Sequence, residues 1–340
     1  MATIDDVARE AHVSKGTVSN VFSKKRPVSR EVSERVLDAA RRLDFRPNYL
    51  ARTLATKKTH IIGLNMFAEN MKFSYFHLSL INGVLRSCYH HGYRLLINTI
   101  TANYNDHLEQ MTSDPVDGEI ILDPIADDPR LKRLTQRGIP VVVVGRPPSG
   151  IQKAVSFVDN DNVETAREVT TCLIGLGHQK ILFLNNEQMR TVAEDRVRGY
   201  HQAFDDNGLH FDDSFIAYKD PAQTSVDFGY EMLRSYIQAG KAPTAVITDT
   251  DKMALGVYRA AAELGLRIPE DISVMAFSDD SVFGPELQPP LSGVRLNAET
   301  LGSEAVNMLI ERMSDDTRQT KKVFVSSELV IRASCTNCGV

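Results

Sequence analysis

The sequence lacks long apolar runs and an apolar leader. No run approaches the roughly 20 apolar residues that a bilayer-spanning helix needs. The opening MATIDDVARE is polar and charged, unlike the apolar core of a secretory signal peptide. We therefore expect a cytoplasmic protein without a membrane partner.

Cysteine is also scarce, with 4 in 340 residues. Cys88 and Cys172 fall in segments with a helical pattern, and Cys335 and Cys338 stand in the sequence CTNC near the end. This distribution is not a disulfide framework, and CTNC lacks the second cysteine pair or nearby histidine of a four-ligand zinc site. We expect no metal site and no cofactor, and we interpret CTNC as incidental, with a redox or metal role as the alternative.

Motifs of the common enzyme classes are absent as well. The sequence has no GxSxG elbow, no phosphate-binding P-loop, no HExxH and no GxGxxG. Gly175 and Gly177 in LIGLGHQ precede an apolar run instead of following one, so they suit a helix end and a turn. The pair His90 and His91 is better explained by a solvated helix end than by a metal site. We expect a protein that is not an enzyme.

Charge is abundant but unevenly divided. The chain has 42% hydrophobic and 24% charged residues, as in a globular protein with room for two or three domains. Residues 1–58 carry 13 Lys and Arg against 7 Asp and Glu, a net charge of +6, whereas the whole chain carries -5 and the remainder therefore -11. A basic head on an acidic body indicates that the head alone meets a polyanion.

Three short helices are predicted in this head. Apolar residues recur at i, i+3, i+4 and i+7 over residues 4–11, and helical spacing returns along 15–22 and 29–43. Ser14 and Ser29 precede the second and third helices and are suited to cap them. Three short helices joined by tight turns make a helix-turn-helix unit, whose second helix enters the major groove of DNA.

The polar side of the second helix carries residues that can read bases. Near its start the outward residues are Lys15, Gly16, Thr17 and Asn20. Lysine donates to guanine acceptors and asparagine pairs with adenine, which gives Lys15 and Asn20 a role in sequence readout. An amphipathic bundle with solvated charges is the alternative, and the basic excess weakens it.

The first 64 residues carry a specific combination of motifs: T-I-x-D-V-A-x-x-A-x-V-S-x-x-T-V-S, then V-S-x-x-x-x-x-x-V, then Pro-Asn-x-x-A-R-x-L. With this combination the chain resembles the LacI/GalR family of transcriptional repressors, and the likeness extends over essentially all 340 residues. The resemblance implies that the head and the segment after it contact operator DNA. The residues expected at this contact are Thr3, Ser14, Lys15, Gly16, Thr17, Ser19, Asn20, Asn48, Ala51, Arg52, Leu54 and Ala55.

The run PNYLARTLATKKT, residues 47–59, links the head to the body. Asn48 is suited to cap a helix of about two turns, which is marginal in water unless something packs against it. We therefore expect this helix to form only on DNA. The resemblance implies the family's hinge helix, which pairs with its two-fold mate in the minor groove and uses Leu54 as an apolar wedge that bends the duplex. A flexible linker is the alternative.

Beyond residue 60, apolar strand runs such as HIIGLNMF, PVVVVGR and TAVITDT alternate with helical segments. This alternation predicts doubly wound parallel sheets, so the fold class is an all-α head followed by an α/β body. The resemblance implies the two lobes of a periplasmic binding protein. We place the domains at 1–46, 47–59 and 60–340, with a first lobe of about 60–158 and 293–321 and a second of about 163–289 and 325–340. The expected lobe crossings are at 154–163, 291–294 and 321–324.

Ligands of parallel sheets bind at the carboxyl ends of the strands, which here lie between the lobes. Arg196 in AEDRVRGY matches the family arginine whose guanidinium takes paired hydroxyls of a polar effector; a surface helix arginine is the alternative. Thr250 and Asp251 match a pair that commonly faces the ligand, while Asp249 is suited to cap the helix that begins there. The other expected effector contacts are Tyr75, Phe76, Asp123, Arg146, Asp159, Ser278 and Asp279.

These candidates leave the class of effector open. Tyr75 and Phe76 open a helix and can stack on the apolar face of a sugar, with a core role as the alternative. Where the family commonly has G-F-D-D after DISVM, this chain has AFSD, so Ser278 replaces an aspartate that often accepts a hydroxyl. Either Asp279 compensates, or the effector differs from a neutral hexose. An anionic sugar acid or sugar phosphate would suit the arginines Arg146, Arg196 and Arg295.

These features predict a dimeric, sequence-specific repressor whose affinity for a near-palindromic operator is set by a small effector, a sugar or sugar derivative. Effector binding would change the angle between the lobes and so order or melt the hinge helices. A regulator controlled by a nucleobase, a sugar phosphate or a partner protein is the alternative. A free-standing sugar-binding receptor shares the body fold, but it needs an export signal and has no use for the head.

Overall fold

The computed structural model describes residues 2–23, 26–45, 58–67, 73–100, 115–279, 282–314 and 319–338. The chain divides into two compact units, residues 1–59 and 60–340. Within the described ranges, no helix is both long and apolar enough to cross a bilayer.

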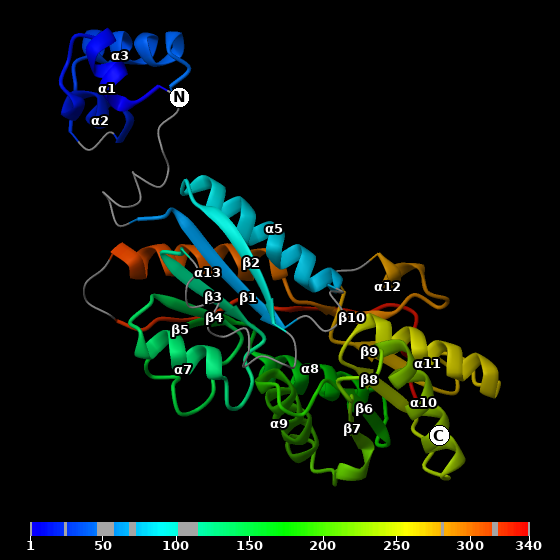
Figure 1. The fold of residues 1–340 in the computed structure, drawn as a ribbon. Coiled ribbons are helices and arrows are strands. Elements are labelled where there is room, and N and C mark those ends of the chain that lie inside the picture. Colours follow the sequence, from blue (N-terminus) through cyan, green and yellow to red (C-terminus); the bar gives the residue numbers. More distant parts are fainter. Residues whose placement is uncertain are drawn as a thin grey trace. The chain divides into compact units, whose positions relative to one another are not determined.

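The first unit contains the helices α1 (Ile4–Glu10), α2 (Lys15–Ser23) and α3 (Arg30–Arg42) (Figure 1). A capping box starts α1, because the side chains of Thr3 and Asp6 each accept from the backbone N–H of the other. The Ser29 side chain caps α3 by accepting from the Val32 N–H. The apolar faces enclose one core, whose fully buried members include Val7, Ala11, Val18, Val36 and Ala39. The predicted three-helix head is confirmed.

The first lobe of the body is a parallel sheet in the order β11-β5-β4-β3-β1-β2. The strands are β1 Ile61–Phe67, β2 Arg94–Ile100, β3 Gly118–Leu122, β4 Val141–Val144, β5 Ser156–Asp159 and β11 Lys322–Phe324. Helices α5 (Tyr75–His90) and α13 (Ala298–Ser314) pack on one face, and α7 (Pro129–Gln136) packs on the other. The inner strands β3, β4 and β5 are buried along their whole length, and β4 is accordingly four valines in a row.

The second lobe has the sheet order β12-β10-β9-β8-β6-β7, parallel except where β12 runs antiparallel to β10. Its strands are β6 Ile181–Asn185, β7 Ile216–Tyr218, β8 Ala245–Thr248, β9 Ser273–Ala276, β10 Ser292–Arg295 and β12 Glu328–Val330. One face carries α8 (Asn162–Gly175) and α9 (Thr191–Asp206), and the other carries α10 (Ser225–Gln238) and α11 (Asp251–Leu264). Two short helices, η3 (Asp213–Phe215) and α12 (Phe283–Glu286), complete it. The predicted α/β body is confirmed.

Along the described chain, the lobes are joined between β5 and α8, between β10 and α13, and between β11 and β12. The second and third crossings lie later than predicted. Strand β10 pairs with β9 and β12, so residues 293–295 belong to the second lobe and not to the first. Strand β11 pairs with β5, so residues 322–324 extend the first sheet. Strands of three or four residues show too little apolar pattern to reveal which sheet they join.

Glycines allow α5 and α13 to pack backbone against backbone. A Cβ atom on Gly83 would lie 1.9 Å from the Glu299 carbonyl oxygen, and one on Gly302 would lie 2.2 Å from the Leu80 carbonyl oxygen. No larger residue fits at either position without moving a helix. The two helices therefore lie in direct backbone contact, and together they cover one face of the first sheet (Figure 1).

Candidate DNA-binding and effector sites

The start of α2 presents polar groups at the surface of the head. Ser14 caps the helix, because its Oγ accepts a hydrogen bond of 3.1 Å from the Thr17 N–H. Lys15 Nζ lies 2.6 Å from Asp5 Oδ1 in an exposed ion pair, which is weak and can give way to a phosphate or a base. Val18 is buried beneath them. The predicted contacts of α2 are at least partly exposed: Ser14, Lys15, Gly16, Thr17, Ser19 and Asn20.

Thr3 stands at the start of α1, where its Oγ1 donates to Asp6 Oδ2 at 2.7 Å. Its side chain is thus part of the helix cap, and a role in contacting DNA stays a prediction. The remaining DNA-contact candidates lie outside the described residues: Asn48, Ala51, Arg52, Leu54 and Ala55.

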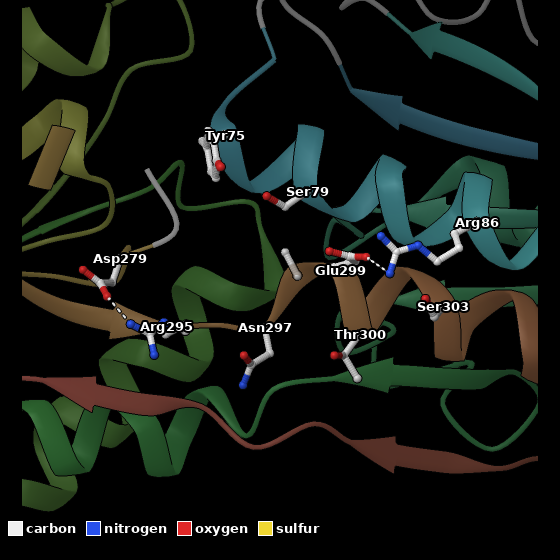
Figure 2. A pocket seen from close by; sticks show the side chains of 10 residues that line it. Tyr75, Ser79, Arg86, Asp279, Arg295, Asn297, Glu299, Thr300 and Ser303 are labelled. Carbon is white, nitrogen blue, oxygen red and sulfur yellow. Dashed lines mark hydrogen bonds and ion pairs between the residues drawn. The ribbon is translucent and has the colours of Figure 1, made fainter. Parts of the chain in front are cut away.

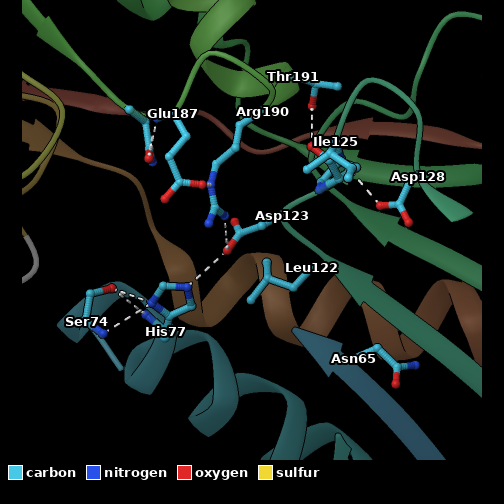
Figure 3. Close-up of polar contacts among 12 residues, drawn as sticks. Asn65, Ser74, His77, Leu122, Asp123, Ile125, Asp128, Glu187, Arg190 and Thr191 are labelled. Atoms are coloured by element: carbon cyan, nitrogen blue, oxygen red, sulfur yellow. Dashed lines mark hydrogen bonds and ion pairs between the residues drawn. The ribbon is translucent and has the colours of Figure 1, made fainter. Parts of the chain in front are cut away.

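In the body, loops at the carboxyl ends of the two sheets meet (Figure 3). The Ala126 N–H donates to the Met189 carbonyl oxygen at 3.0 Å, and the Thr191 N–H donates to the Pro124 carbonyl oxygen at 3.2 Å. Charged side chains from both lobes stand at strand ends and helix starts around this junction. We call the following residues the interlobe cluster: Asp123 after β3, Arg146 after β4, Asp159 ending β5, Glu187 and Arg190 after β6, Asp195 and Arg196 in α9, and Asp249 after β8.

Asp123 links the lobes by charge (Figure 3). Its Oδ2 lies 3.1 Å from Nε2 of His77 on α5 and 3.2 Å from Nη1 of Arg190 in the second lobe. Its φ of 53° lies in the left-handed region, which is costly for a residue other than glycine. Burial acts to raise the pKa of Asp123, but the His77 hydrogen bond and the Arg190 charge outweigh it and hold the pKa well below its usual value. Asp123 is therefore a fixed anion at neutral pH.

Arg146 forms a second bridge between the lobes. Its Nε lies 2.6 Å from Asp195 Oδ2, and its Nη2 lies 2.5 Å from Glu194 Oε2. Nη2 also donates to the Thr191 carbonyl oxygen at 3.4 Å. Because Asp195 is buried, this ion pair is shielded from water and its attraction is correspondingly strong. The guanidinium of Arg146 thus serves contacts between the lobes.

Arg196 is buried in the second lobe. Its Nη1 pairs with Asp249, and its Nε donates to Asn162 Oδ1 at 3.3 Å. Its guanidinium carbon lies 4.4 Å from the centroid of the Phe277 ring. The alternative of a solvated surface arginine is wrong, because only 5% of Arg196 is exposed. A guanidinium held between a carboxylate and an aromatic face is oriented in advance for paired hydrogen bonds.

Helix α11 is capped by Thr250 and not by Asp249. The Thr250 Oγ1 accepts from the Met253 N–H at 3.3 Å, so the alternative in which Asp249 caps this helix is wrong. Burial raises the pKa of Asp249, against the charges of Arg196 and Arg190. Asp251 is buried and accepts from the backbone N–H that follows it at 2.8 Å. Direct contact of Thr250 and Asp251 with an effector stays a prediction.

Asp159 is held by amide groups. Its Oδ1 accepts from the Asn160 N–H at 2.9 Å and from Asn162 Nδ2 at 3.0 Å. Burial and the negative charge of Asp195 raise the pKa of Asp159 to about 8. At neutral pH the carboxyl therefore holds a proton most of the time, and it can donate a hydrogen bond.

Tyr75 and Asp279 line a different hollow, a groove of about 540 Å³ beside α5 and α13 (Figure 2). No residue of the interlobe cluster lines this groove. Asp279 Oδ2 lies 3.2 Å from Arg295 Nη2, and its Oδ1 lies 2.5 Å from Arg332 Nη1. Asp279 is thus engaged by two arginines, which weakens the idea that it replaces the family aspartate as a hydroxyl acceptor.

The remaining predicted effector contacts are Phe76, Ser278 and Tyr75. Phe76 packs against the apolar cores of both lobes, which favours its core role over stacking on a ligand. Ser278 is partly exposed just after β9. Tyr75 is 45% exposed at the start of α5. A contact of any of these three with an effector stays a prediction.

The structure places four predicted residues close enough for their charges to interact: Asp123, Arg146, Asp159 and Arg196. Arg146 and Arg196 act on the pKa of Asp159, and Asp123 acts on that of Asp249 beside Arg196. Sequence reasoning missed Glu187 and Arg190, although both follow the carboxyl end of β6 and the same strand-end rule would have found them. It also missed His77 and Asp195, for which the sequence holds no comparable signal.

Comparison with known proteins agrees with this architecture. Residues 3–48 match the model of bacterial regulatory proteins of the lacI family, and residues 170–335 match the periplasmic binding protein-like domain. The chain is 32% identical over 341 residues to the HTH-type transcriptional repressor PurR of Haemophilus influenzae, with 98% of both proteins covered. It is 31% identical over 339 residues to the ribose operon repressor of Escherichia coli, with 98% of this chain and 100% of that protein covered.

Among solved structures, the complex of the transcriptional regulator CelR with cellobiose is similar, with a TM-score of 0.76 at 27% identity. The match covers 98% of this chain and 100% of that one. The family models match the head and the body, and the relatives match the full length of the chain. This chain therefore belongs to the lacI family and is a DNA-binding transcriptional regulator.

Proposed function

We propose that this regulator is a repressor whose affinity for operator DNA is set by a small carbohydrate bound between its two lobes. The observation that carries the proposal is the interlobe cluster, where buried and partly buried charged side chains from both lobes converge at the carboxyl ends of the strands. A ligand at this junction contacts both lobes at once. Its binding energy therefore biases the angle between them.

The chemistry of the cluster suits hydroxyl groups. Arg196 lies against the ring of Phe277 and beside Asp249, so a donor and an acceptor stand next to each other near an aromatic face. Adjacent sugar hydroxyls both donate and accept, and they match such a pair. The relative CelR, solved as a complex with cellobiose, supports a carbohydrate over other small effectors.

The proposed protein partner is another copy of the chain, and α5 offers a face for it. Leu78, Leu85 and Tyr89 recur at i, i+7 and i+11 along this helix and are 47%, 46% and 87% exposed. An exposed apolar row of this kind is typical of a protein contact. A two-fold contact through this row would give each half of a near-palindromic operator its own head.

We assign one function to each of three consecutive segments of the chain. The DNA-binding head spans residues 1–46, the hinge 47–59, and the effector and dimerisation domain 60–340. The boundary between the two compact units supports the last division. The hinge would pass a change of lobe angle to the heads. Because the target is chromosomal DNA, the proposed location is the cytoplasm.

The proposal is tested with full-length protein and DNA. The preferred operator is selected from random duplexes, and its affinity is then measured by fluorescence anisotropy with and without cellobiose, ribose, glucose, adenine or guanine. We expect a site with two-fold symmetry and one sugar that changes the operator Kd by about 5- to 150-fold. A response to a purine base alone would overturn the carbohydrate assignment, and a selected site without two-fold symmetry would overturn the dimer.

A further inference from the structure

We propose that the effector is an uncharged polyol and that its site rejects sugar acids and sugar phosphates. This inference rests on the proposed function, because it concerns the ligand of the same site. It follows from how the cations of the interlobe cluster are already paired, and it decides between the neutral and anionic ligands that the arginine-rich sequence leaves open.

Arg146 has two carboxylate partners. Asp195 lies 2.6 Å from its Nε and Glu194 lies 2.5 Å from its Nη2. An anionic ligand that approached this guanidinium would have to displace or oppose two negative charges. The two carboxylates therefore already neutralise the positive charge that an unpaired arginine would present to a phosphate or carboxylate.

Arg190 is paired in the same way. Its Nε lies 3.0 Å from Glu187 Oε2, and its Nη1 lies 3.2 Å from Asp123 Oδ2. Glu187 is in turn 3.6 Å from the Nζ of Lys219. The two cations and two carboxylates alternate, which leaves no excess positive charge on this side of the cluster.

Arg196 has one carboxylate partner, Asp249, and both side chains are buried. Water cannot screen a second anion placed beside this pair, so the anion would be repelled by Asp249 almost as strongly as it is attracted by Arg196. Hydroxyl groups meet no such opposition, because they can accept from the guanidinium and donate to the carboxylate at once.

Charges in and next to the interlobe cluster cancel. The cations are Arg146, Arg190, Arg196, Arg198 and Lys219, and the carboxylates paired with them are Asp123, Glu187, Glu194, Asp195 and Asp249. Asp159, which is mostly protonated at neutral pH, adds little further charge. A balanced site offers an anion no net attraction to offset the cost of removing it from water.

Arg295, the third arginine that could have favoured an anion, is also engaged. It lies 3.2 Å from Asp279 and 2.7 Å from Glu328. It also lines the groove beside α5 and α13, which no interlobe cluster residue lines. It therefore gives the interlobe site no unpaired positive charge.

The first test uses inorganic phosphate as the probe and needs no knowledge of the effector. Thermal unfolding of the full-length protein is compared in phosphate and in chloride of equal ionic strength. The proteins are the wild type and two isosteric variants. Asp249→Asn removes the carboxylate paired with Arg196, and Glu187→Gln removes the carboxylate that Arg190 and Lys219 share. Asp271→Asn is the matched control, because it removes the carboxylate paired with the exposed Arg267, which is not part of the interlobe cluster.

We expect phosphate to raise the Tm of both cluster variants by about 3 °C more than that of the wild type, the shift produced by a ligand at about ten times its Kd. The control should behave as the wild type does. Binding of phosphate to the basic head is common to all four proteins and cancels. Equal shifts in all four proteins would overturn the inference, because they would mean that carboxylate pairing does not govern anion binding here.

The second test compares matched ligands by thermal shift and operator response: glucose with gluconate and glucose 6-phosphate, ribose with ribose 5-phosphate, and cellobiose with cellobionate. We expect the neutral member of a pair to bind at least about 10-fold more tightly, a difference of 1.4 kcal/mol. An anionic member that binds as tightly would overturn the inference and leave the carbohydrate proposal standing. If no sugar binds while the phosphate test succeeds, the carbohydrate proposal fails and the exclusion of anions stands.

Discussion

Arg190 Nη1 and Asp123 Oδ2 lie 3.2 Å apart and form an ion pair between the two lobes. The carboxylate follows strand β3 of the first lobe, and the guanidinium lies in the loop after strand β6 of the second. His77 of α5 contacts the same carboxylate oxygen at 3.1 Å. The angle between the lobes thus depends on buried or half-buried ion pairs, which a ligand at the same place can redistribute.

Replacing Asp123 with Asn should make the free energy of unfolding less dependent on pH in the acid range. The pKa of Asp123 is depressed in the folded state, so its ionised form stabilises the fold above the unfolded pKa of about 4. This stabilisation is lost as pH falls through the lower folded pKa. In urea unfolding, Asp123→Asn should be less stable by about 2 kcal/mol at neutral pH and should lose less on acidification. Parallel pH profiles of the two proteins would contradict the assignment.

Replacing Asp159 with Asn should remove a pH dependence of the opposite sign, in which the free energy of unfolding falls as pH rises. The folded carboxyl keeps its proton up to about pH 8, whereas the unfolded carboxyl releases it near pH 4. Stability therefore falls as pH rises from about 4 to about 8, then levels off. In urea unfolding, the stability of Asp159→Asn relative to the wild type should increase between about pH 5 and pH 8, whereas that of the exposed control Asp205→Asn should not. A constant difference from the wild type across this range would refute the raised pKa.

Arg146 and Arg198 provide a matched pair, because both contact Asp195. Arg146 reaches it from the other lobe, whereas Arg198 lies one turn along the same helix and is 51% exposed. Arg146→Ala should cost about 3 kcal/mol of stability and change the effector concentration needed for half-maximal response. Arg198→Ala should cost less than about 1 kcal/mol and leave the response unchanged. If urea unfolding and effector titration gave similar losses for both variants, the bridge between lobes would have no special role.

The variant Asn20→Ala tests whether the head reads the base sequence of the operator. Asn20→Ala should weaken binding to the selected operator by about 1–3 kcal/mol, because an asparagine that reads adenine loses a bidentate contact. Binding to a random duplex should change little, since phosphate contacts remain. Anisotropy titrations on the two duplexes distinguish these cases. Equal losses on both would reduce Asn20 to a phosphate contact.

How far the sequence predicts the candidate site depends on the range of each interaction. Asp123, Arg146 and Asp159 were predictable, because parallel strands bring their carboxyl ends to one edge of a sheet. His77 and Asp195 were not, because each acts through a partner distant in the sequence. Such contacts arise from how helices and lobes meet, which no local pattern encodes.

The same limit applies to the fold. Apolar strand runs and helical spacing predict the two doubly wound lobes, because burial on both faces imposes a pattern on each strand. The short strands β10 and β11 join their sheets through backbone pairing, so the sequence placed their lobe crossings too early. The sequence presents Asp279 as a candidate hydroxyl acceptor, but no local pattern reveals its ion pair with Arg332 from the last part of the chain.

Control of DNA binding from the interlobe cluster is tested by the operator affinity of the wild type, Arg196→Lys and Arg196→Ala, each with and without the sugar that changes operator affinity in the anisotropy titrations. We expect both variants to dimerise and to bind operator. Arg196→Ala should show no effector response, and Arg196→Lys, which lacks the planar guanidinium, should respond only at much higher effector concentration. A normal effector response in Arg196→Ala would rule out the interlobe cluster as the effector site, because the effector would then act from elsewhere in the protein.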